Sequence, residues 1–531
     1  MQIHGDRGRI HSGSWIYRRR QLPPGFAVAA ALLLSSCHLM ASFKTGPEGR
    51  SIHDTDLRQL VRDESFVEAL DLTDPDDRGD IGDELLRLMH RGLLLHYAGR
   101  YEESNEVLQR AEEISDDRYT KSVSVALLSL VTSDRALAWV PRETERLMVN
   151  YFGALNYLAL GDLDEAAVEA RRLSRQLELS QDEERDPAEV EMRRTLRYFA
   201  GSVFEACGNR NDAAVAYRHV WTASDELTAD EPLRPRFLNL YGEEFPVEYL
   251  RPEPTDSLVG NPSVTAGPGG DVVILLEKGF VAHRVERSLN IPLFPQEADA
   301  LHSPNAEVRL AAASCVASRS FQDKYDFSEI LAESGTDWRG SSGGKCIVSG
   351  SGRSKSEADG TSGREFYLMR VAWPEMVPSG LPTDLTVVGF SVAADAEPLA
   401  TPAMRGSVSG AVTAEFEDQL GGILIKMVAR TALKYELARA IEKEVDKENE
   451  LLGDIAFLTA NAAAALFERA DTRSWHLLPD EMSVVRLRLP AGSHPLTVQV
   501  ETGRSGTQVI DLGDIDVRDG SVHVLSARVW P

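Results

Sequence analysis

The sequence predicts an α+β protein, in which an all-helical N-terminal part precedes a C-terminal part of mixed helices and strands. Helical segments that share one glycine-centred pattern recur between residues 55 and 245. A Pro- and Gly-rich stretch at 246–270 has no apolar period, and β-branched runs begin at residue 271. We therefore expect a helical repeat region, a linker, and an α+β domain at 271–531 that ends in a small sandwich-like group of strands at 481–531.

Length and composition agree with several domains that have real cores. The chain has 531 residues, 43% of them hydrophobic, and only four cysteines. These values exclude a chain that is disordered throughout, a small fold held by disulfides and a polytopic membrane protein. The 83 acidic residues outnumber the 57 Lys and Arg residues, which gives a net charge of −26. Binding along a nucleic-acid backbone needs clustered Lys and Arg, so this charge argues against a nucleic-acid partner.

The first forty residues differ from the rest in their charge and apolar pattern. An arginine-rich start, which includes Arg18-Arg19-Arg20, precedes an apolar stretch at 25–34. This stretch is too short to span a membrane, for which roughly 20 residues are needed. Next comes Leu34-Ser35-Ser36-Cys37, which resembles the lipobox of bacterial lipoprotein precursors. The resemblance implies that residues 1–36 are a signal peptide and that Cys37 is lipidated. The alternative is a buried cysteine that ends a hydrophobic helix.

A lipid at Cys37 would hold the protein at a membrane without spanning it, because a cysteine that carries several acyl chains such as palmitate is a stable anchor. His38 follows the cysteine, at the position where an Asp typically retains lipoproteins at the inner membrane. By analogy with bacterial lipoproteins, we expect the protein to be lipid-anchored in the outer membrane and to face the periplasm. Residues 37–54 are expected to form a short tether.

Three segments at 55–245 predict pairs of helices joined at a glycine turn. Each has a glycine in the turn and a small residue five positions later: Gly99 with Ser104, Gly161 with Ala166, and Gly208 with Ala213. The pattern resembles tetratricopeptide repeats, in which a small residue lets two helices approach closely. The turns are 62 and 47 residues apart rather than 34, so we expect a further degenerate hairpin at 115–145. A helical bundle with similar turns is the alternative to a solenoid.

Stacked helix pairs of this kind curve and expose a concave groove that binds peptides or partner helices. Transfer of the groove-facing positions of the repeat gives a mostly apolar and aromatic set of candidate partner-binding residues. These groove positions are Met89, Leu93, His96, Tyr151, Leu155, Leu158, Tyr198 and Glu205. The set lacks a Lys and Asn cluster that would clamp a terminal carboxylate, which argues against recognition of chaperone tails. For each residue, packing between repeats is the alternative role.

The C-terminal domain is predicted to contain strands on either side of a helical region at 411–470. Strands are expected at 271–276, 281–285, 366–373, 385–392, 483–489, 495–502, 507–512 and 521–529. A Gly- and Ser-rich stretch at 340–363 is expected to be a flexible insertion. The second helix, at 451–467, is apolar nearly all round, but Asp454 and Asn461 favour a buried packing helix over one inserted in a membrane.

The motifs indicate no cofactor, metal or nucleotide site. Gly343-Gly344-Lys345 lacks the earlier glycine and the following Ser or Thr of a phosphate-binding loop. The 12 histidines show no zinc spacing, and the aspartates at 511–519 lack the loop pattern of a calcium site. Ser407 and Ser409 miss the Gly-x-Ser-x-Gly spacing by one residue.

Asp471, Arg473 and His476 lie close together in the sequence and form a candidate acid/base cluster at 468–476. We favour a structural role, in which Asp471 and Arg473 form an ion pair or cap a helix end, while Trp475 and Leu478 plug the preceding helix onto the β domain. No nucleophile with a paired base is evident. We therefore predict that the protein is not an enzyme.

Two strings in the C-terminal part carry a further resemblance. Ala470-Asp471-Thr-Arg473-Ser-Trp475-His-Leu-Leu478-Pro479 is followed by Pro490-Ala491-Gly492. Together they resemble an uncharacterised family of bacterial outer-membrane lipoproteins that combine N-terminal repeats with this C-terminal region. The resemblance covers most of residues 55–530, with the insertion at 340–363 as the clearest departure. It implies an envelope lipoprotein and brings no known activity.

The cysteines other than Cys37 have two expected roles. Cys207 lies on a repeat helix and is expected to be a small core residue. Cys315 and Cys346 bracket the variable segment and are a candidate disulfide in an oxidising compartment.

The predicted function is a non-catalytic, lipid-anchored periplasmic scaffold that binds an envelope protein through the repeat groove, in cell-envelope assembly or maintenance. An accessory factor of peptidoglycan synthesis or of an export machine is a second hypothesis. A periplasmic hydrolase acting through the 468–476 cluster is a third.

Overall fold

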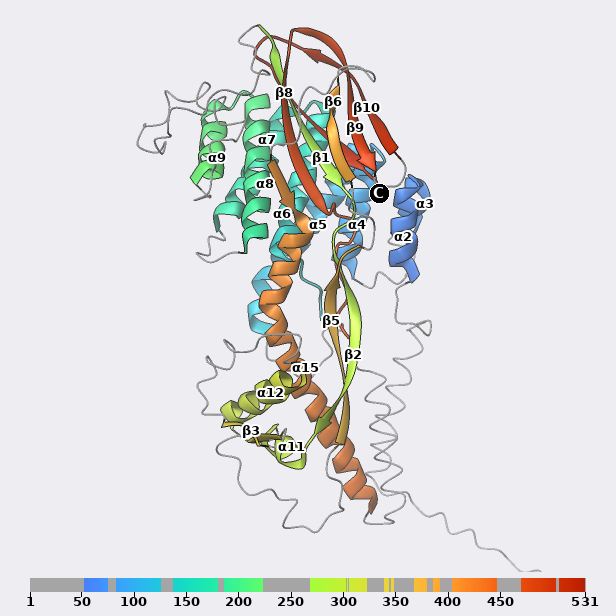
Figure 1. The fold of residues 1–531 in the computed structure, drawn as a ribbon, viewed down its shortest axis with the longest axis vertical. Coiled ribbons are helices and arrows are strands. Elements are labelled where there is room, and N and C mark those ends of the chain that lie inside the picture. Colours follow the sequence, from blue (N-terminus) through green and yellow to red (C-terminus); the bar gives the residue numbers. More distant parts are fainter. Residues whose placement is uncertain are drawn as a thin grey trace, which may run out of the picture.

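The computed structural model describes most of the chain between residues 52 and 530. The described ranges are 52–74, 83–125, 137–179, 186–222, 268–301, 303, 305–321, 339–342, 345–347, 367–379, 385–391, 404–446, 469–502 and 506–530. Cys37, the linker before residue 268 and the helix expected at 451–467 lie outside these ranges. The described residues form an elongated molecule with a broad body at one end and a narrow arm at the other (Figure 1).

We define the body as the helices before residue 223 and the two larger sheets. Its helices are α2 (Ile52–Arg62), α3 (Phe66–Asp71), α4 (Glu84–Tyr97), α5 (Tyr101–Val125), α6 (Glu143–Leu160), α7 (Leu163–Leu179), α8 (Pro187–Ala206) and α9 (Arg210–Thr222). The pairs α4/α5, α6/α7 and α8/α9 are each joined by a glycine with positive φ: +72° at Gly99, and +75° at Gly161 and Gly208. These turns lie where the sequence predicted them, because glycine adopts this conformation without the strain of a Cβ.

The helices of each pair approach closely at small residues. The side chains predicted to lie beneath the turns, Ser104, Ala166 and Ala213, are all 0% exposed. A further hairpin was expected at 115–145; residues 126–136 of this stretch lie outside the described ranges, and those that are described do not by themselves form one. Helix α5 continues to Val125, and residues 137–142 are not helical. Residues 112–125 contain no Gly or Pro, so nothing in that stretch ends the helix.

A four-stranded sheet packs on this helical part, and a three-stranded sheet packs on the other face of the first. One has four strands in the order β11–β1–β8–β7: β1 (Gly270–Lys278), β7 (Met404–Ser407), β8 (Glu481–Leu489) and β11 (Val522–Val529). β11 is parallel to β1, and the other neighbours are antiparallel. The other sheet has the order β10–β9–β6: β6 (Leu385–Ser391), β9 (Gly492–Thr502) and β10 (Gly506–Val517). A sandwich made from 481–531 alone is therefore a wrong expectation, because β1, β6 and β7 come from earlier in the chain.

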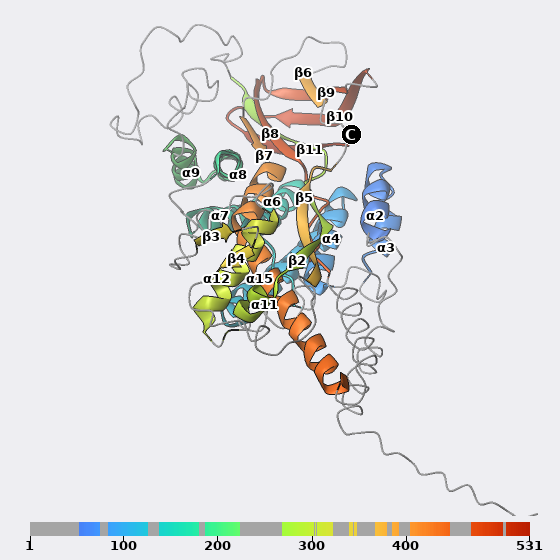
Figure 2. The same ribbon diagram turned by 60° about the horizontal axis from the view of Figure 1, so that its bottom comes forward.

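Strand β1 connects the layers of the body. All nine of its residues are buried, as predicted for a strand covered on both faces. Val273 and Leu275 belong to a core shared with the helices, whereas Val272 and Ile274 belong to the core between the two sheets. The layers therefore follow in the order three-stranded sheet, four-stranded sheet, helices (Figure 2). One continuous core runs from the helices into the C-terminal strands.

We define the arm as the described residues of 283–379 together with the part of helix α15 that leaves the body. Its ribbon is the antiparallel pair β2 (His283–Leu293) and β5 (Tyr367–Val377). It also contains α11 (Pro295–Leu301), α12 (Ala306–Phe321), β3 (Arg339–Ser342) and β4 (Lys345–Ile347). Helix α15 (Val408–Asp446) begins beside α8 in the body and ends in the arm (Figure 1). Val316, Val371 and Leu424 lie in the core of the arm.

One negative finding concerns membranes. Within the described ranges, no helix combines the length and the apolar character that crossing a bilayer requires.

Candidate functional site

The groove positions lie in the packed interior, many of them where the helices meet the four-stranded sheet, a region that we call the junction. Exposure is 0% for Leu93 and Tyr151, 1% for Met89, 4% for Leu155, 6% for Tyr198 and 8% for His96. Leu158 packs partly buried on the same core, and the Glu205 side chain is 7% exposed. The expectation of an open groove at these residues is therefore wrong for this structure. Packing between helices and against the chain's own sheet covers them.

Tyr151 shows how the sheet occupies the inner face of the helices. Its hydroxyl donates to Oε1 of Glu277 at 2.8 Å, and Glu277 is 1% exposed near the end of β1. Burial raises the pKa of Glu277 to about 7, against the opposing effect of Arg528. A buried carboxyl group requires a hydrogen-bond partner. A tyrosine predicted to bind another protein supplies that partner within the chain.

Arg486 of β8 is the centre of a second polar link across the junction. Its guanidinium donates to Asp271 Oδ2 at 2.6 and 3.0 Å and to Glu205 Oε2 at 2.6 Å. Each of the three side chains is between 3% and 7% exposed. The hydroxyl of Tyr217 also donates to Glu205, at 2.6 Å. One buried cation therefore joins a carboxylate of β1 to a carboxylate of α8. Its hydrogen bonds offset the cost of removing these charges from water.

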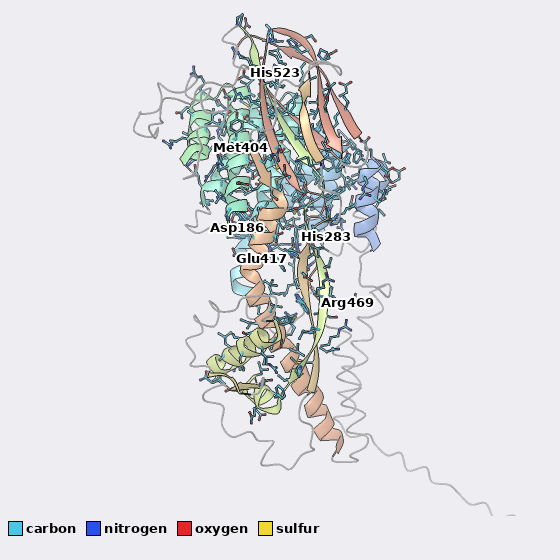
Figure 3. All side chains as sticks on the ribbon, viewed as in Figure 1. Asp186, His283, Met404, Glu417, Arg469 and His523 are labelled. Carbon is cyan, nitrogen blue, oxygen red and sulfur yellow. The ribbon has the colours of Figure 1, made fainter. Side chains whose placement is uncertain are left out.

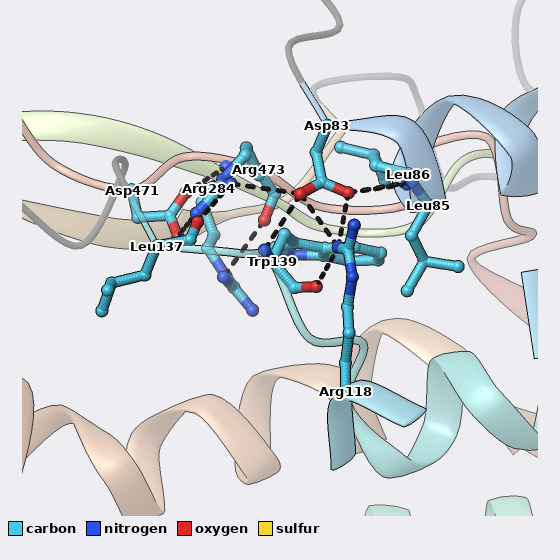
Figure 4. Close-up of polar contacts among 9 residues, drawn as sticks. All are labelled: Asp83, Leu85, Leu86, Arg118, Leu137, Trp139, Arg284, Asp471 and Arg473. Carbon is cyan, nitrogen blue, oxygen red and sulfur yellow. Dashed lines mark hydrogen bonds and ion pairs between the residues drawn. The ribbon is translucent and has the colours of Figure 1, made fainter. Parts of the chain in front are cut away.

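A third polar link surrounds Asp83, which caps the start of α4 (Figure 4). Its carboxylate accepts from Arg118 at 2.7 and 2.9 Å, from the backbone N of Trp139 at 3.0 Å and from that of Leu85 at 2.9 Å. Arg473 lies 3.6 Å away. Burial by itself would raise the pKa of Asp83, but the Trp139 amide and Arg118 lower it below its usual value. The ionised carboxylate thus joins α4 and α5 to the C-terminal half.

Arg473 belongs to the 470–479 string, for which we predicted a structural role. The expected ion pair is confirmed, since Arg473 donates to Asp471 at 2.7 and 2.8 Å. Trp475 is buried, at 1% exposed, but the helix that it was expected to plug onto the β domain lies outside the described residues. The backbone N of Trp475 donates to Glu145 of α6 at 2.9 Å, and its ring packs 6.4 Å from that of Phe152. Trp475 therefore fastens the C-terminal half to the N-terminal helices. The prediction had placed Trp475 against the β domain instead.

The acid/base candidate His476 is enclosed. It is 4% exposed, and its ring lies 4.4 Å from that of His90 between centroids. Burial, followed by the charges of Arg58 and His283, lowers the pKa of His476 well below its usual value. A general base must reach a proton of the substrate, and this imidazole lies beneath the surface.

The remaining sequence candidates accept hydrogen bonds from backbone N–H groups. Ser409 Oγ accepts from the backbone N of Ala282 at 2.8 Å, and Ser407 Oγ accepts from that of Gly410 at 2.9 Å. Asp511 Oδ1 accepts from the backbone N of Gly513 at 2.9 Å, in a turn of β10. Within the described ranges, no group of three or more His, Cys, Asp or Glu side chains is arranged to hold a metal ion.

The cysteines divide between the two parts of the molecule. Cys315 of α12 is disulfide-bonded and 3% exposed, and strand β4, which carries Cys346, packs against α12. This placement agrees with the predicted pair. The side chain of Cys346 lies outside the described residues, so the pairing stays a prediction. Cys207 is a half-buried free thiol, and burial raises its pKa to about 11.

Sequence reasoning missed the charges that hold the junction together, foremost Asp83, Asp271 and Arg486. A signal for Arg486 was present, because Arg486 and Arg488 interrupt the apolar residues between Val484 and Leu489 on β8. A charge inside an otherwise apolar strand indicates a buried partner. The sequence does not reveal that partner, because Glu205 lies 281 residues away.

Comparisons with other proteins give no further guide. No protein-family model matches the chain, and no curated protein or solved structure matches it either. The resemblance to outer-membrane lipoproteins therefore stays a prediction.

Proposed function

We propose that the protein is a non-catalytic scaffold of the bacterial cell envelope, anchored by lipid at Cys37 in the outer membrane and facing the periplasm. The three helix pairs with left-handed glycine turns support repeats of the tetratricopeptide type. In this proposal, their inner face holds the chain's own sheet, and a protein partner binds elsewhere. The observation that supports binding elsewhere is the burial of the groove positions, above all the hydrogen bond between Tyr151 and Glu277, because it leaves these residues covered by the chain's own sheet.

The polar links across the junction support a body that acts as one unit. Removing one partner of a buried ion pair costs about 3–5 kcal/mol. A partner protein that displaced the sheet would have to replace Arg486, Asp271 and the Tyr151 contact together. Surfaces that are already exposed are therefore the better candidates for binding. On the arm, residues 287–290 of β2 are exposed, with Leu289 at 41%.

The anchor is tested with Cys37→Ser in the full-length chain. We expect the variant to remain an uncleaved precursor, to take up no labelled palmitate and to leave the outer-membrane fraction. Cys207→Ser is the matched control, since Cys207 is a free thiol that caps the C-terminal end of α8 in the body. A Cys37→Ser variant that is still processed and lipid-labelled would contradict the anchor.

The site of partner binding is tested by photo-crosslinking in living cells, with the crosslinker at Leu289 or at Tyr151. From Leu289 we expect a crosslink to a defined protein that also binds the purified chain, whereas Tyr151 should crosslink only within the chain. The opposite pattern would restore the groove as the binding site. In addition, hydrolase screening with His476→Ala as a control addresses the enzyme hypothesis, for which we expect no turnover.

A further inference from the structure

Three histidines and one arginine meet where the N-terminal helices contact the 470–479 string. We call Arg58, His90, His283 and His476 the clasp. Arg58 comes from α2, His90 from α4, His283 from the start of β2 and His476 from the string. His283 lies where the ribbon leaves the body (Figure 3). The clasp thus joins segments from both ends of the described chain.

Arg58 makes the hydrogen bonds that hold the clasp closed. It donates to the carbonyl oxygen of His476 at 3.1 and 3.3 Å and to that of Val281 at 3.2 Å. Its Nη1 lies 3.2 Å from Nδ1 of His283. A guanidinium only donates, so Nδ1 of His283 must accept and cannot carry a proton. The closed clasp therefore requires a neutral imidazole at His283.

The other two imidazoles form the buried side of the clasp. His90 is 1% exposed and His476 is 4% exposed, with their ring centroids 4.4 Å apart. Nδ1 of His476 lies 3.3 Å from the carbonyl oxygen of Ser474, an arrangement that favours a proton on Nδ1. Burial, then Arg58, then His283, lower the pKa of His476 well below its usual value. A proton on His476 would therefore place a second positive charge, shielded from water, next to the guanidinium of Arg58.

Three carboxylates contact the 470–479 string or lie on it. Glu145 of α6 accepts from the backbone N of Trp475, Glu286 of β2 from that of Ala470, and Asp471 of the string from Arg473. The further cation nearby, Arg284, donates to the carbonyl of Arg473 at 3.1 Å.

We propose that the clasp is an acid-sensitive contact, which holds α2 on the 470–479 string at neutral pH and releases it below about pH 6, when its imidazoles take up protons. Release is local. It separates α2 from the string, while the two sheets stay folded.

The direction of the effect follows from proton binding. In the closed state His283 and His476 are held neutral, whereas in the open state both titrate near pH 6.5 like ordinary histidines. The open state then binds more protons, so the stability of the closed state is complete above about pH 6.5 and declines as the pH falls. Each histidine that protonates only on opening raises the opening constant by up to about tenfold per pH unit.

Hydrogen–deuterium exchange of the full chain at pH 7.5, 6.5, 5.5 and 5.0 tests this, after correction for intrinsic exchange rates. We expect protection at 52–62 and 470–479 to fall by about tenfold or more per pH unit below pH 6.5. Amides of β1 serve as the internal reference and should keep their protection. Protection at 52–62 that stays constant relative to β1 from pH 7.5 to 5.0 would overturn the proposal.

A variant that keeps the hydrogen bonds of the clasp but lacks the imidazoles of His283 and His476 shows whether the opening in acid comes from the clasp or from other acid effects on the chain. In the double variant His283→Asn/His476→Asn, the amide oxygen introduced at position 283 accepts from Arg58. The amide N–H introduced at position 476 can donate to the carbonyl oxygen of Ser474. We expect its opening to lose the pH dependence, whereas His494→Gln on β9 should behave as the wild type. Should the double variant not fold, the single His283→Asn variant still tests the proposal. The change of its opening constant with pH should be smaller than that of the wild type by up to about tenfold per pH unit. An unchanged slope in either variant contradicts the proposal.

Discussion

Strands β1 and β2 follow one another in the chain, yet they lie in regions of opposite character. β1, in the body, has a strand on each side and is buried at all nine positions. β2, in the arm, has one strand neighbour among the described residues and is exposed at residues 287–290. The number of layers and neighbours around a strand therefore decides its burial. In the body, helices and a second sheet cover both faces of β1, while in the arm part of β2 stays exposed.

The two regions also differ in how they hold charges. In the body, the side chains of Arg486 and Asp271 are each 3% exposed. In the arm, the side chains of the pair Arg287 and Glu375 are 51% and 27% exposed. Exposed pairs contribute about 0–1 kcal/mol, whereas breaking a buried pair costs several times more. Perturbing the junction should therefore affect the whole body, and perturbing the arm should have a local effect.

The largest expected effect comes from Arg486→Ala. It leaves Asp271 and Glu205 buried without their cation, so we expect a loss of about 3–5 kcal/mol in the free energy of unfolding, measured by urea denaturation. Arg488→Ala is the control, since Arg488 is 25% exposed and lies 3.3 Å from the same Asp271. Its expected cost is about 1 kcal/mol or less. Equal losses in the two variants would remove the contrast between buried and exposed charge.

The next effect should be confined to the arm. Cys315→Ser removes a disulfide that lies in the core of the arm, with an expected loss of about 2–4 kcal/mol. We expect hydrogen exchange to rise in α12 and at the far end of β2, with no change in β1. Cys207→Ser, which replaces a free thiol in the body, should change stability by less than about 1 kcal/mol. Loss of protection in β1 would show that the two regions unfold together.

The joint between the regions should respond to pH through Glu415 of α15. Its carboxylate accepts from the backbone N of Thr144 of α6 at 2.8 Å, and burial raises its pKa to about 7. A raised pKa gives stability that is present below the ordinary pKa of about 4.5 and is lost as the pH rises through 7. Between pH 5 and 8 the wild type should thus lose about 2–3 kcal/mol relative to Glu415→Gln, measured by urea denaturation at each pH. Glu417→Gln, exposed on the same helix, should follow the wild type. Parallel curves for Glu415→Gln and the wild type would contradict this assignment.

The smallest effect is expected from close packing where α15 meets the body. An added Cβ at Gly410 would lie 2.7 Å from Cβ of Ala188 on α8, so Gly410→Ala should cost about 1–3 kcal/mol in thermal or urea unfolding. Gly422 lies on the same helix with nothing within 4 Å of an added Cβ. Gly422→Ala should therefore stabilise the chain by up to about 1 kcal/mol. A gain in stability for Gly410→Ala would show that α15 does not dock tightly on α8.

Local features of the fold could be predicted because local interactions decide them. Gly99, Gly161 and Gly208 lie in turns because a left-handed residue is required there. The buried strand at 270–278 followed from its continuous apolar run. The candidate site could be predicted only in part. The ion pair of Asp471 with Arg473 joins residues two positions apart, whereas the partner of Arg486 lies on a distant helix.

The sequence by itself determined the classes of elements, the turns, the burial of β1 and the structural use of the 470–479 string. Periodicity, glycine and charge spacing act over a few residues and are visible in one dimension. Only the tertiary structure decided what covers the inner face of the helices. The residues that would suit a groove for a foreign peptide, Tyr151 and Tyr198 among them, are equally suited to a strand of the same chain. Apolar and aromatic side chains do not distinguish the two, because the physical requirement, burial with satisfied polar atoms, is the same.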